Sequence, residues 1–152
     1  MKLSTKGRYG LRALIDLATY SEEEAVSISS IAARQHISEG YLEQLVAKLR
    51  KAGLVTSIRG ATGGYRLAKD PSQISVGDIL RALEGSLEAV ECPGLKDENT
   101  CEGADFCVTK YVWKRINDSI NQTVDDIKLD RLMAESKKAR EMGWVNNSNC
   151  EN

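Results

Sequence analysis

Three cysteines, Cys92, Cys101 and Cys107, lie within sixteen residues of one another and carry the side chains best suited to chemistry in this chain. Thiolates are the preferred ligands of iron–sulfur clusters and of zinc, and a loop can fold three of them around one centre. Gaps of eight and five residues separate the cysteines, whereas structural zinc sites commonly use Cys-x-x-Cys pairs. The spacing argues against zinc, which stays the least favoured interpretation beside cluster binding and unligated, redox-active thiols.

The rest of the sequence bears on the redox environment of these thiols. No apolar stretch approaches the roughly 20 residues that span a bilayer, and the start MKLSTKGRYG has no apolar segment behind its charges. We therefore expect a cytoplasmic protein, in which four cysteines indicate metal or redox chemistry rather than a disulfide framework.

The cysteine region is expected to be a polar loop, containing proline and glycine, that leads into a long helix. This helix should begin near Asp105 or Val108. Its apolar residues have close to i, i+4 spacing over about five turns, which suits packing against a second copy of the chain. We assign Tyr111 and Trp113 to the same packing rather than to a cofactor. The apolar stripe is Val108, Val112, Ile116, Ile120, Val124 and Ile127.

Upstream of the cysteines, three segments have the periodicity and the capping residues of helices. The second and third are short and are joined by a tight turn at His36, which is typical of a helix-turn-helix. The three helices are expected from Ser4 to Tyr20, from Ser27 or Ser29 to Gln35, and from the cap Ser38 to Ala52 with Gly53 as the stop.

A β-hairpin should follow directly. Residues 54–59 and 65–68 have β character, and the glycine-rich residues 60–64 form the tip between them. After the hairpin, Ser75 is positioned to cap a fourth helix that ends before Gly85. A hairpin attached to a helix-turn-helix is a wing.

These elements predict a mainly α fold with a small β-hairpin, a winged helix-turn-helix followed by a long C-terminal dimerisation helix. The expected parts are a DNA-binding domain over residues 1–84, a cysteine-containing cofactor loop over 85–107, the dimerisation helix and a C-terminal helix over 108–142, and a disordered polar tail over 143–152.

The charge distribution favours a nucleic-acid partner for the first half, although the whole chain has a net charge of −1. Residues 1–70 hold eleven Lys and Arg against seven Asp and Glu, a net charge of +4, and residues 71–152 hold ten against fifteen, a net charge of −5. DNA binding requires a cationic surface for phosphates and a protruding element that fits the major groove. Both are expected here, so we prefer DNA binding to a winged helix used only for protein contacts.

The third helix is the element predicted to read the bases. Gln44 can make a bidentate contact to adenine and Glu43 can accept a hydrogen bond from cytosine. The glycines of the hairpin tip let the backbone turn sharply and approach the minor groove. Lys6, Arg8, Lys48 and Arg59 are predicted phosphate contacts. The complete predicted DNA-binding set is Lys6, Arg8, Ser38, Tyr41, Glu43, Gln44, Lys48, Arg59, Gly60, Gly63 and Gly64.

Several stretches together resemble the IscR-like winged-helix regulators of bacteria, which include sensors of iron–sulfur clusters, nitric oxide and cysteine metabolism. They are MKLSTKGRYGLRALIDLA, ISEGYLEQLVAKLRKAGLVTSIRGATGGYRLAKDP, ISVGDILRALEG and, after the cysteines, VWKRINDSI, and they extend to about Leu132. The resemblance implies a homodimer, crossed by long C-terminal helices, that binds palindromic or related operators with half-sites about one helical turn apart.

The resemblance also implies a cofactor site. Cys92, Cys101 and Cys107 are similar to the three cysteines of the cluster-binding branch, which implies an iron–sulfur cluster, of the 2Fe-2S type. In that branch a histidine three residues beyond the third cysteine completes the site, but here that position is Lys110. Lysine is a poor ligand at neutral pH because its ammonium must first lose a proton. The fourth ligand stays open among His36, Cys150, a carboxylate such as Glu43, and a carboxylate of the partner subunit.

The sequence therefore predicts a homodimeric transcriptional regulator that senses cluster status, with cluster-assembly or cysteine-metabolism proteins as further partners. Cluster occupancy would order the loop and change operator affinity by a population shift. The alternative is a cluster-free regulator of the same fold that responds to thiol oxidation or to a partner enzyme of cysteine metabolism. An enzyme is not expected, because the chain has one histidine and lacks a nucleophile elbow and a phosphate-binding glycine loop.

Overall fold

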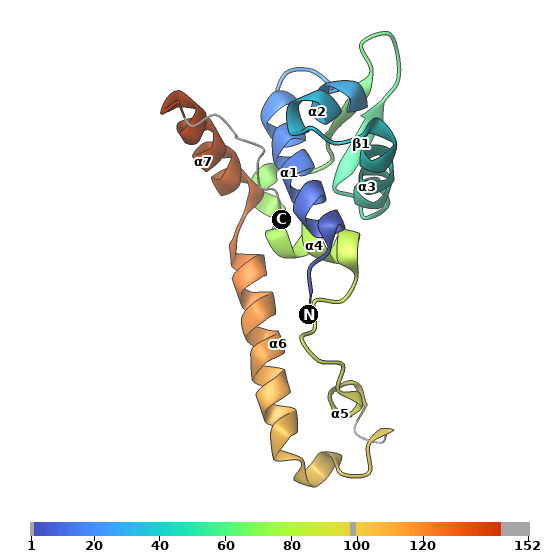
Figure 1. Ribbon diagram of the computed structural model, residues 1–152, viewed down its shortest axis with the longest axis vertical. Helices are drawn as coiled ribbons and strands as arrows, with labels where there is room; N and C mark the ends of the chain where they lie inside the picture. The colour runs from blue at the N-terminus through green and yellow to red at the C-terminus, as the bar shows by residue number, and fades with distance from the viewer. Residues whose placement is uncertain (1, 98–99, 144–152) are drawn as a thin grey trace.

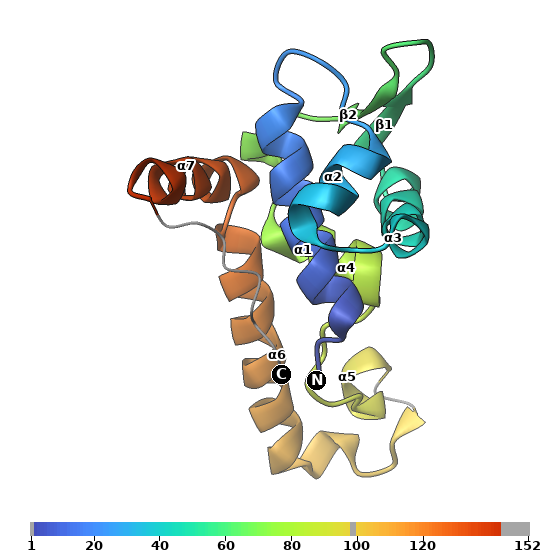
Figure 2. The ribbon, with the colours of Figure 1, turned by 45° about the horizontal axis from the view of Figure 1, so that its top comes forward.

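The computed structural model describes residues 2–97 and 100–143 of the chain. Helices α1 to α4 and the hairpin form a rounded head, α6 runs beside the head and beyond it, and α5 lies near the far end of α6 (Figures 1 and 2). The elements are α1 (Thr5–Tyr20), α2 (Ile28–Gln35), α3 (Glu39–Lys51), β1 (Val55–Ile58), β2 (Gly64–Leu67), η1 (Pro71–Gln73), α4 (Val76–Glu84), α5 (Pro93–Lys96), η3 (Ala104–Phe106), α6 (Val108–Asp126) and α7 (Leu129–Glu141).

A serine begins each of the first four α-helices, as the sequence predicted. The hydroxyl oxygen of each cap accepts a hydrogen bond from a backbone N–H of the first turn, which satisfies a donor that the helix itself leaves unpaired. For α4 the cap is reciprocal, because Asp78 also accepts from the N–H of Ser75. The four caps are Ser4, Ser27, Ser38 and Ser75.

The core of the head is built from the apolar faces of the first four helices. Their largest side chains are at most 1% exposed, and burying each such side chain contributes about 2 kcal/mol relative to leaving it in water. This core fixes α3 against α1 and α4 and leaves its opposite face exposed. The side chains include Leu14, Leu17, Ile31, Leu42, Leu45, Leu49 and Ile79, and Ile74, between η1 and α4, packs with them.

The wing is a two-stranded antiparallel sheet in which Val55 pairs with Leu67 and Ile58 with Gly64. It is attached to the head by a third segment, because the backbones of Val26 and Tyr65 exchange two hydrogen bonds of 2.9 and 2.8 Å. The predicted hairpin is therefore confirmed, and its base is held as part of a three-segment unit.

The apolar stripe of α6 is divided between two environments. Its C-terminal half, Ile120, Val124 and Ile127, packs within the same chain on a cluster formed by α4 and the residues after it. In its N-terminal half, Val108, Val112 and Ile116 are 77%, 51% and 38% exposed. The expectation that the whole stripe faces a second copy is wrong for the C-terminal half, because the chain itself packs on it, and it stays a prediction for the N-terminal half.

The cysteine region contains more structure than the predicted loop, namely the short helix α5 and the turn η3. In the C-terminal part, α7 packs on α1 and follows α6 after one short break. Of the tail predicted to be disordered, residues 144–152 with Cys150 lie outside the described residues. Over the described ranges, none of the helices has both the length and the apolar character needed to cross a membrane.

Candidate nucleic-acid interface and cysteine loop

The face of α3 that points away from the core carries the side chains predicted to read bases. Glu43 and Gln44 are exposed, while their neighbours Leu42 and Leu45 are buried at 0% and 1%. Ser38, also in the predicted set, serves as the N-cap and accepts from the N–H of Tyr41. The arrangement presents polar groups on a convex helix surface, which is the geometry that enters a major groove.

Tyr41 is half-buried and connects α3 to the start of α1. Its ring meets the ring of Tyr9 edge-on, with centroids 6.2 Å apart, and its hydroxyl lies 3.2 Å from Thr5 Oγ1. These contacts fix the first turn of α3 relative to the first turn of α1, where the predicted phosphate contacts Lys6 and Arg8 are exposed.

A buried carboxylate holds the turn between α2 and α3. Asp16 is 2% exposed and accepts hydrogen bonds from the Arg34 guanidinium, at 2.7 to 3.1 Å, and from Gln35 Nε2 at 2.8 Å. Arg12 in turn donates to the side-chain and backbone oxygens of Gln35, at 3.3 and 3.2 Å. Sequence reasoning missed this network, although a carboxylate within the apolar face of α1 was a signal for a buried partner.

The turn itself is closed by His36, which is exposed and lies in the left-handed region with φ of 53°. Its N–H donates to Ala32 O, so this residue ends α2 as glycine commonly does in other helices. Its place in the turn gives this histidine a backbone role.

The other predicted phosphate contacts differ in their surroundings. Arg59 is exposed at the end of the wing. Lys48 Nζ donates to the carbonyl oxygen of Leu83 at 3.3 Å, so this side chain contacts the C-terminal turn of α4. A cation near the last carbonyl groups of a helix is favourable, and Lys48 therefore also connects α3 to α4.

The three wing glycines occupy their positions for different structural reasons. Gly60 has φ of 124°, and a Cβ built there would contact nothing within 4 Å. A Cβ at Gly63 would lie 2.8 Å from Gly60 O, and one at Gly64 would lie 2.6 Å from the carbonyl carbon of Val26. Gly63 and Gly64 thus permit close backbone packing, and the demanding backbone conformation at the tip belongs to Gly60.

Glu84 attaches the start of α1 to the end of α4. Its carboxylate accepts from Ser4 N and Gly7 N at 2.8 and 2.9 Å and from the hydroxyl of Ser4. Burial by itself would raise the pKa of this carboxyl group, but the hydrogen bonds from Ser4 and Gly7 outweigh it and hold the pKa below its ordinary value.

The three predicted ligands occupy the segment between α4 and α6. Cys92, Cys101 and Cys107 are free thiols and half-buried. The segment folds back on the first turn of α6, because a Cβ built at Gly94 would lie 3.6 Å from Cys101 Cβ and 3.7 Å from Lys110 Cδ. Lys110, which stands where the resemblance expects a histidine, is 8% exposed and its ammonium lies 5.6 Å from the ring centroid of Tyr111.

Cys107 has a thiol whose pKa is lowered by its surroundings. It is the residue before α6, and its Sγ lies 3.2 Å from Thr109 Oγ1. The hydrogen bond with the Thr109 side chain and that with the N–H of Lys110 lower the pKa of this thiol below its ordinary value. A thiolate is therefore easier to form at Cys107, as either metal binding or oxidation requires.

The donor set of this segment fits an iron–sulfur cluster, because three thiolates are the ligands that such clusters use. Among the described residues, no three Cys, His, Asp or Glu side chains already stand in the geometry of a metal site. The chain thus brings the three cysteines into one segment without assembling their sulfur atoms.

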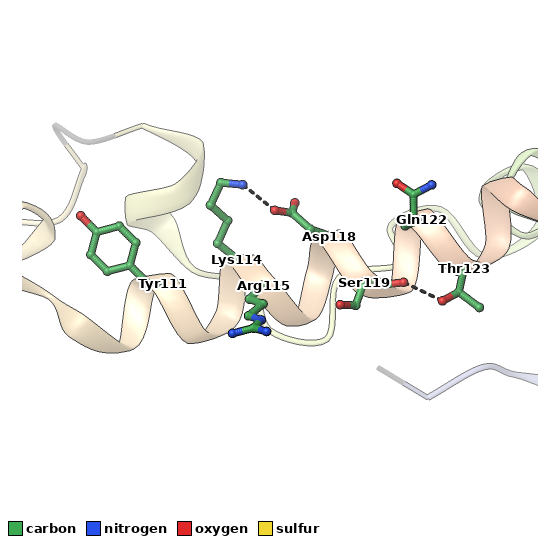
Figure 3. Close-up of a pocket in the computed structure, with 7 residues that line it drawn as sticks. All are labelled: Tyr111, Lys114, Arg115, Asp118, Ser119, Gln122 and Thr123. Carbon is green, nitrogen blue, oxygen red and sulfur yellow. Dashed lines mark hydrogen bonds and ion pairs between the residues drawn. The ribbon is translucent and has the colours of Figure 1, made fainter.

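One side of α6 carries an open groove lined with polar and aromatic side chains (Figure 3). Arg115 and Ser119 also line an adjoining apolar patch with Val112, Ile116 and Ile120. The residues drawn in Figure 3 are Tyr111, Lys114, Arg115, Asp118, Ser119, Gln122 and Thr123. Together with the exposed half of the stripe, they give α6 a mixed face of the kind that packs against another helix.

Comparison with known proteins shows which of them are similar to this chain. Residues 3–135 match the model of the Rrf2 family, described as iron-dependent transcriptional regulators. The HTH-type transcriptional regulator IscR of Vibrio atlanticus is 43% identical over 137 residues, which cover 90% of this chain and 78% of the relative.

Two solved structures are similar as well. The global cysteine regulator CymR of B. subtilis has a TM-score of 0.73 and 46% identity, over 89% of this chain and 98% of that one. IscR of T. potens has a TM-score of 0.72 and 47% identity, over 92% and 91%.

These similarities decide the class of function. They confirm the winged-helix fold and the expected DNA-binding transcriptional regulator, and they exclude the enzyme class, since the relatives are regulators of transcription. From the family match over most of its length and from relatives above 40% identity, this chain belongs to the Rrf2 family of iron-dependent transcriptional regulators.

Proposed function

We propose that this chain acts in the cytoplasm as a homodimeric, sequence-specific regulator that senses an iron–sulfur cluster, of the 2Fe-2S type, through Cys92, Cys101 and Cys107. The main support for the proposal is that three free thiols lie on one folded segment, which contacts the first turn of α6. The similarity to IscR of T. potens, at 47% identity, supports the same assignment.

For DNA, the proposal assigns base readout to Glu43 and Gln44 on α3. Lys6, Arg8, Lys48 and Arg59 contact phosphates on either side, Ser38 and Tyr41 orient the first turn of α3, and the wing tip, Gly60, Gly63 and Gly64, lies at the minor groove. The exposure of Glu43 and Gln44 and the rigid support of the turn by Asp16 support this assignment.

For the dimer, the proposal assigns the partner contact to the N-terminal half of α6. Val108, Val112 and Ile116 are exposed there, and an exposed apolar patch of this kind marks an interaction surface. A homodimer with twofold symmetry would place two recognition helices on two half-sites of one operator. The expected parts thus become a head over residues 1–84, a cofactor loop over 85–107, and a dimerisation region over 108–142.

For the cluster, the three cysteines would supply thiolate ligands, and the cluster would supply a centre that gains or loses electrons and can be assembled or lost. The hydrogen bonds from the Thr109 side chain and from the N–H of Lys110 lower the pKa of the Cys107 thiol below its ordinary value. Lys110 places a positive charge near the segment, which favours thiolates but makes the side chain a poor ligand. The fourth ligand therefore comes from another group, and a carboxylate of the partner subunit is one candidate.

The test is an absorption spectrum with iron and acid-labile sulfide analysis on protein purified without oxygen. We expect a visible charge-transfer spectrum and equal amounts of iron and sulfide, both absent from a Cys92→Ala, Cys101→Ala, Cys107→Ala variant. Cys150→Ala tests the remaining cysteine separately: a lost spectrum would make Cys150 the fourth ligand, and a kept spectrum would leave Cys92, Cys101 and Cys107 as the thiolate ligands. A colourless wild-type protein that still binds DNA and cannot be reconstituted would overturn cluster sensing.

The second candidate is a cluster-free regulator that responds to thiol oxidation or to a partner enzyme of cysteine metabolism. The similarity to CymR, the global cysteine regulator of B. subtilis, at 46% identity, favours it. In that case the protein would be colourless, and its DNA affinity would change either on treatment with hydrogen peroxide or only when the partner enzyme is added.

A further inference from the structure

The head and α6 are connected by a polar ladder on one face of α6. Asn117, Asn121 and Asp125 lie four residues apart, so they occupy successive turns of the same face. Each side chain accepts a hydrogen bond from the α4 side of the structure. The partners are the N–H of Ala89 for Asn117, the guanidinium of Arg81 for Asn121, and Arg81 with the hydroxyl of Ser75 for Asp125.

Arg81 is the centre of this ladder. Its two terminal nitrogens contact both carboxylate oxygens of Asp125, at 2.8 and 2.9 Å, and one of them also contacts Asn121 Oδ1 at 2.7 Å. A bidentate arginine–carboxylate pair has a preferred planar geometry, so it fixes direction as well as distance. The hydrogen bonds with Arg81 hold the pKa of Asp125 below its ordinary value, so the carboxylate is charged near neutral pH.

Gly77 makes room for this pair. It is buried in the first turn of α4, and a Cβ built on it would overlap Asp125 Oδ1 and lie 2.7 Å from Arg81 Nη1. Within a helix glycine is in general less favourable than alanine, by up to about 1 kcal/mol in the interior. The close approach of α6 to α4 at the ion pair explains the glycine, because it leaves no space for a Cβ at this position.

The apolar contacts alone do not set the angle between α4 and α6. Val76 and Leu80 pack on Ile120, Val124 and Ile127, and this burial stabilises the contact without a preferred direction. Directional contacts flank it, including the hydrogen bonds from Val76 N to Ile127 O and from Leu129 N to Ile74 O, both of 2.9 Å.

The other end of the ladder reaches the cysteine segment. Asn117 is 8% exposed, and its Oδ1 accepts from Ala89 N at 2.9 Å, three residues before Cys92. Asn121 Nδ2 donates to the carbonyl oxygen of Asn117, which joins the two turns. One continuous set of hydrogen bonds thus runs from the cysteine segment along α6 to α4.

We infer that Arg81, Asp125 and Asn117 are positioning residues, which fix the angle of the head on α6 and thereby set the spacing of the two recognition helices in the dimer. The inference rests on the proposed homodimer that binds two half-sites. Lys48 supports the connection on the head side, because it donates to Leu83 O at the end of α4 and so relates α3 to the same helix.

The test compares Asp125→Asn with wild-type protein on synthetic duplexes. The probes are a two-half-site duplex selected from random DNA by the wild-type protein, versions with the spacing changed by one or two base pairs, and a duplex with one half-site. We expect Asp125→Asn to bind the parent duplex about 10-fold more weakly, to change by less than about 2-fold on the single half-site, and to lose most of its discrimination between spacings.

The matched control is Glu135→Gln, which removes the exposed Arg131–Glu135 pair within α7 and should match wild type on every duplex.

A second experiment tests the end of the ladder at the cysteine segment. Asn117→Leu should speed amide hydrogen exchange over residues 86–97, whereas Asn117→Asp, which keeps an acceptor, should not. Unchanged spacing discrimination in Asp125→Asn, with a dimeric wild type that prefers the parent spacing, would overturn the inference and leave the proposed function intact. A wild type that binds as a monomer without spacing preference would overturn both.

Discussion

At the scale of single residues, the buried carboxylate of Asp16 explains how a short turn can hold the recognition helix. A carboxylate that is 2% exposed is stable only when its oxygens are paired, and here they accept from Arg34 and Gln35. The Arg34 guanidinium also lies 4.0 Å from the ring centroid of Tyr20, which shields the pair from the other side. The turn is thus supported from α1 and not only by its own residues.

The corresponding prediction concerns Asp16→Ala. Removing the carboxylate leaves Gln35 without this acceptor and Arg34 without its ion-pair partner. We therefore expect the free energy of unfolding to fall by about 2–3 kcal/mol. This loss is smaller than the usual cost of breaking a fully buried ion pair because the Arg34 side chain is 31% exposed. Urea unfolding measures the effect, and Glu24→Ala on the exposed bend serves as the control. An unchanged urea midpoint would show that the network does not stabilise the turn.

At the scale of elements, the start of α1 is held by a residue of α4 rather than by its own sequence alone. Three groups of residues 4–7 donate to Glu84, and the positive end of the α1 dipole faces this carboxylate. Placing Lys6 and Arg8 beside the recognition helix therefore depends on a contact across about 80 residues of sequence. The amides of Lys6 and Gly7 already donate to Ser4 Oγ and to Glu84, so in the proposed DNA complex the phosphate contacts from this region would rest on the basic side chains.

This contact predicts a pH dependence of stability. The pKa of Glu84 is lower in the folded protein than in the unfolded chain, where it is about 4.3. The stability that Glu84 contributes is therefore complete above the unfolded pKa and is lost as pH falls through the lower folded value. We expect Glu84→Gln to reduce the free energy of unfolding by about 1–2 kcal/mol at pH 7 and by progressively less below about pH 4. Thermal unfolding of both proteins between pH 7 and pH 3 measures this difference, and a pH-independent difference would contradict the assigned role.

At the scale of the whole molecule, α6 separates two sites. The helix has 19 residues, so it is about 28 Å long, and the cysteine segment lies at the opposite end of the structure from the wing (Figure 1). A signal at the cysteines can reach DNA only through packed elements, and the ladder on α6 is one such route. The exposed N-terminal half of α6 adjoins the cysteine segment, so a partner subunit bound there would lie close to the thiols.

The proposed dimer is tested by Val112→Glu combined with Ile116→Glu. Burying two carboxylates at a helix–helix contact costs several kcal/mol, so we expect a monomer with at least about 30-fold weaker binding to a two-half-site duplex. Light scattering during size-exclusion chromatography measures the mass of each variant in solution. Ala134→Glu, on the exposed side of α7, is the control and should stay dimeric. A dimeric double variant would place the interface elsewhere.

Local signals in the sequence were enough to predict the order and bounds of most elements. Serine caps, helical periodicity and the glycine-rich tip are local signals, because each depends on residues within a few positions, and they located α1 to α4, the wing and the start of α6. The cysteine trio could also be located, since its chemistry is a property of residue type. The short helix α5 was missed because its four residues carry no periodic pattern.

Tertiary structure decided which partner each face and charge meets. Periodicity showed that α6 has an apolar stripe, but only the packing divides it into a half covered by α4 and a half left exposed. Likewise, nothing near Lys48, Glu84 or Asp125 in sequence indicates Leu83, Ser4 or Arg81 as their partners. Such contacts join residues distant in sequence, and a local pattern cannot specify them because the packing of the complete core determines which residues meet.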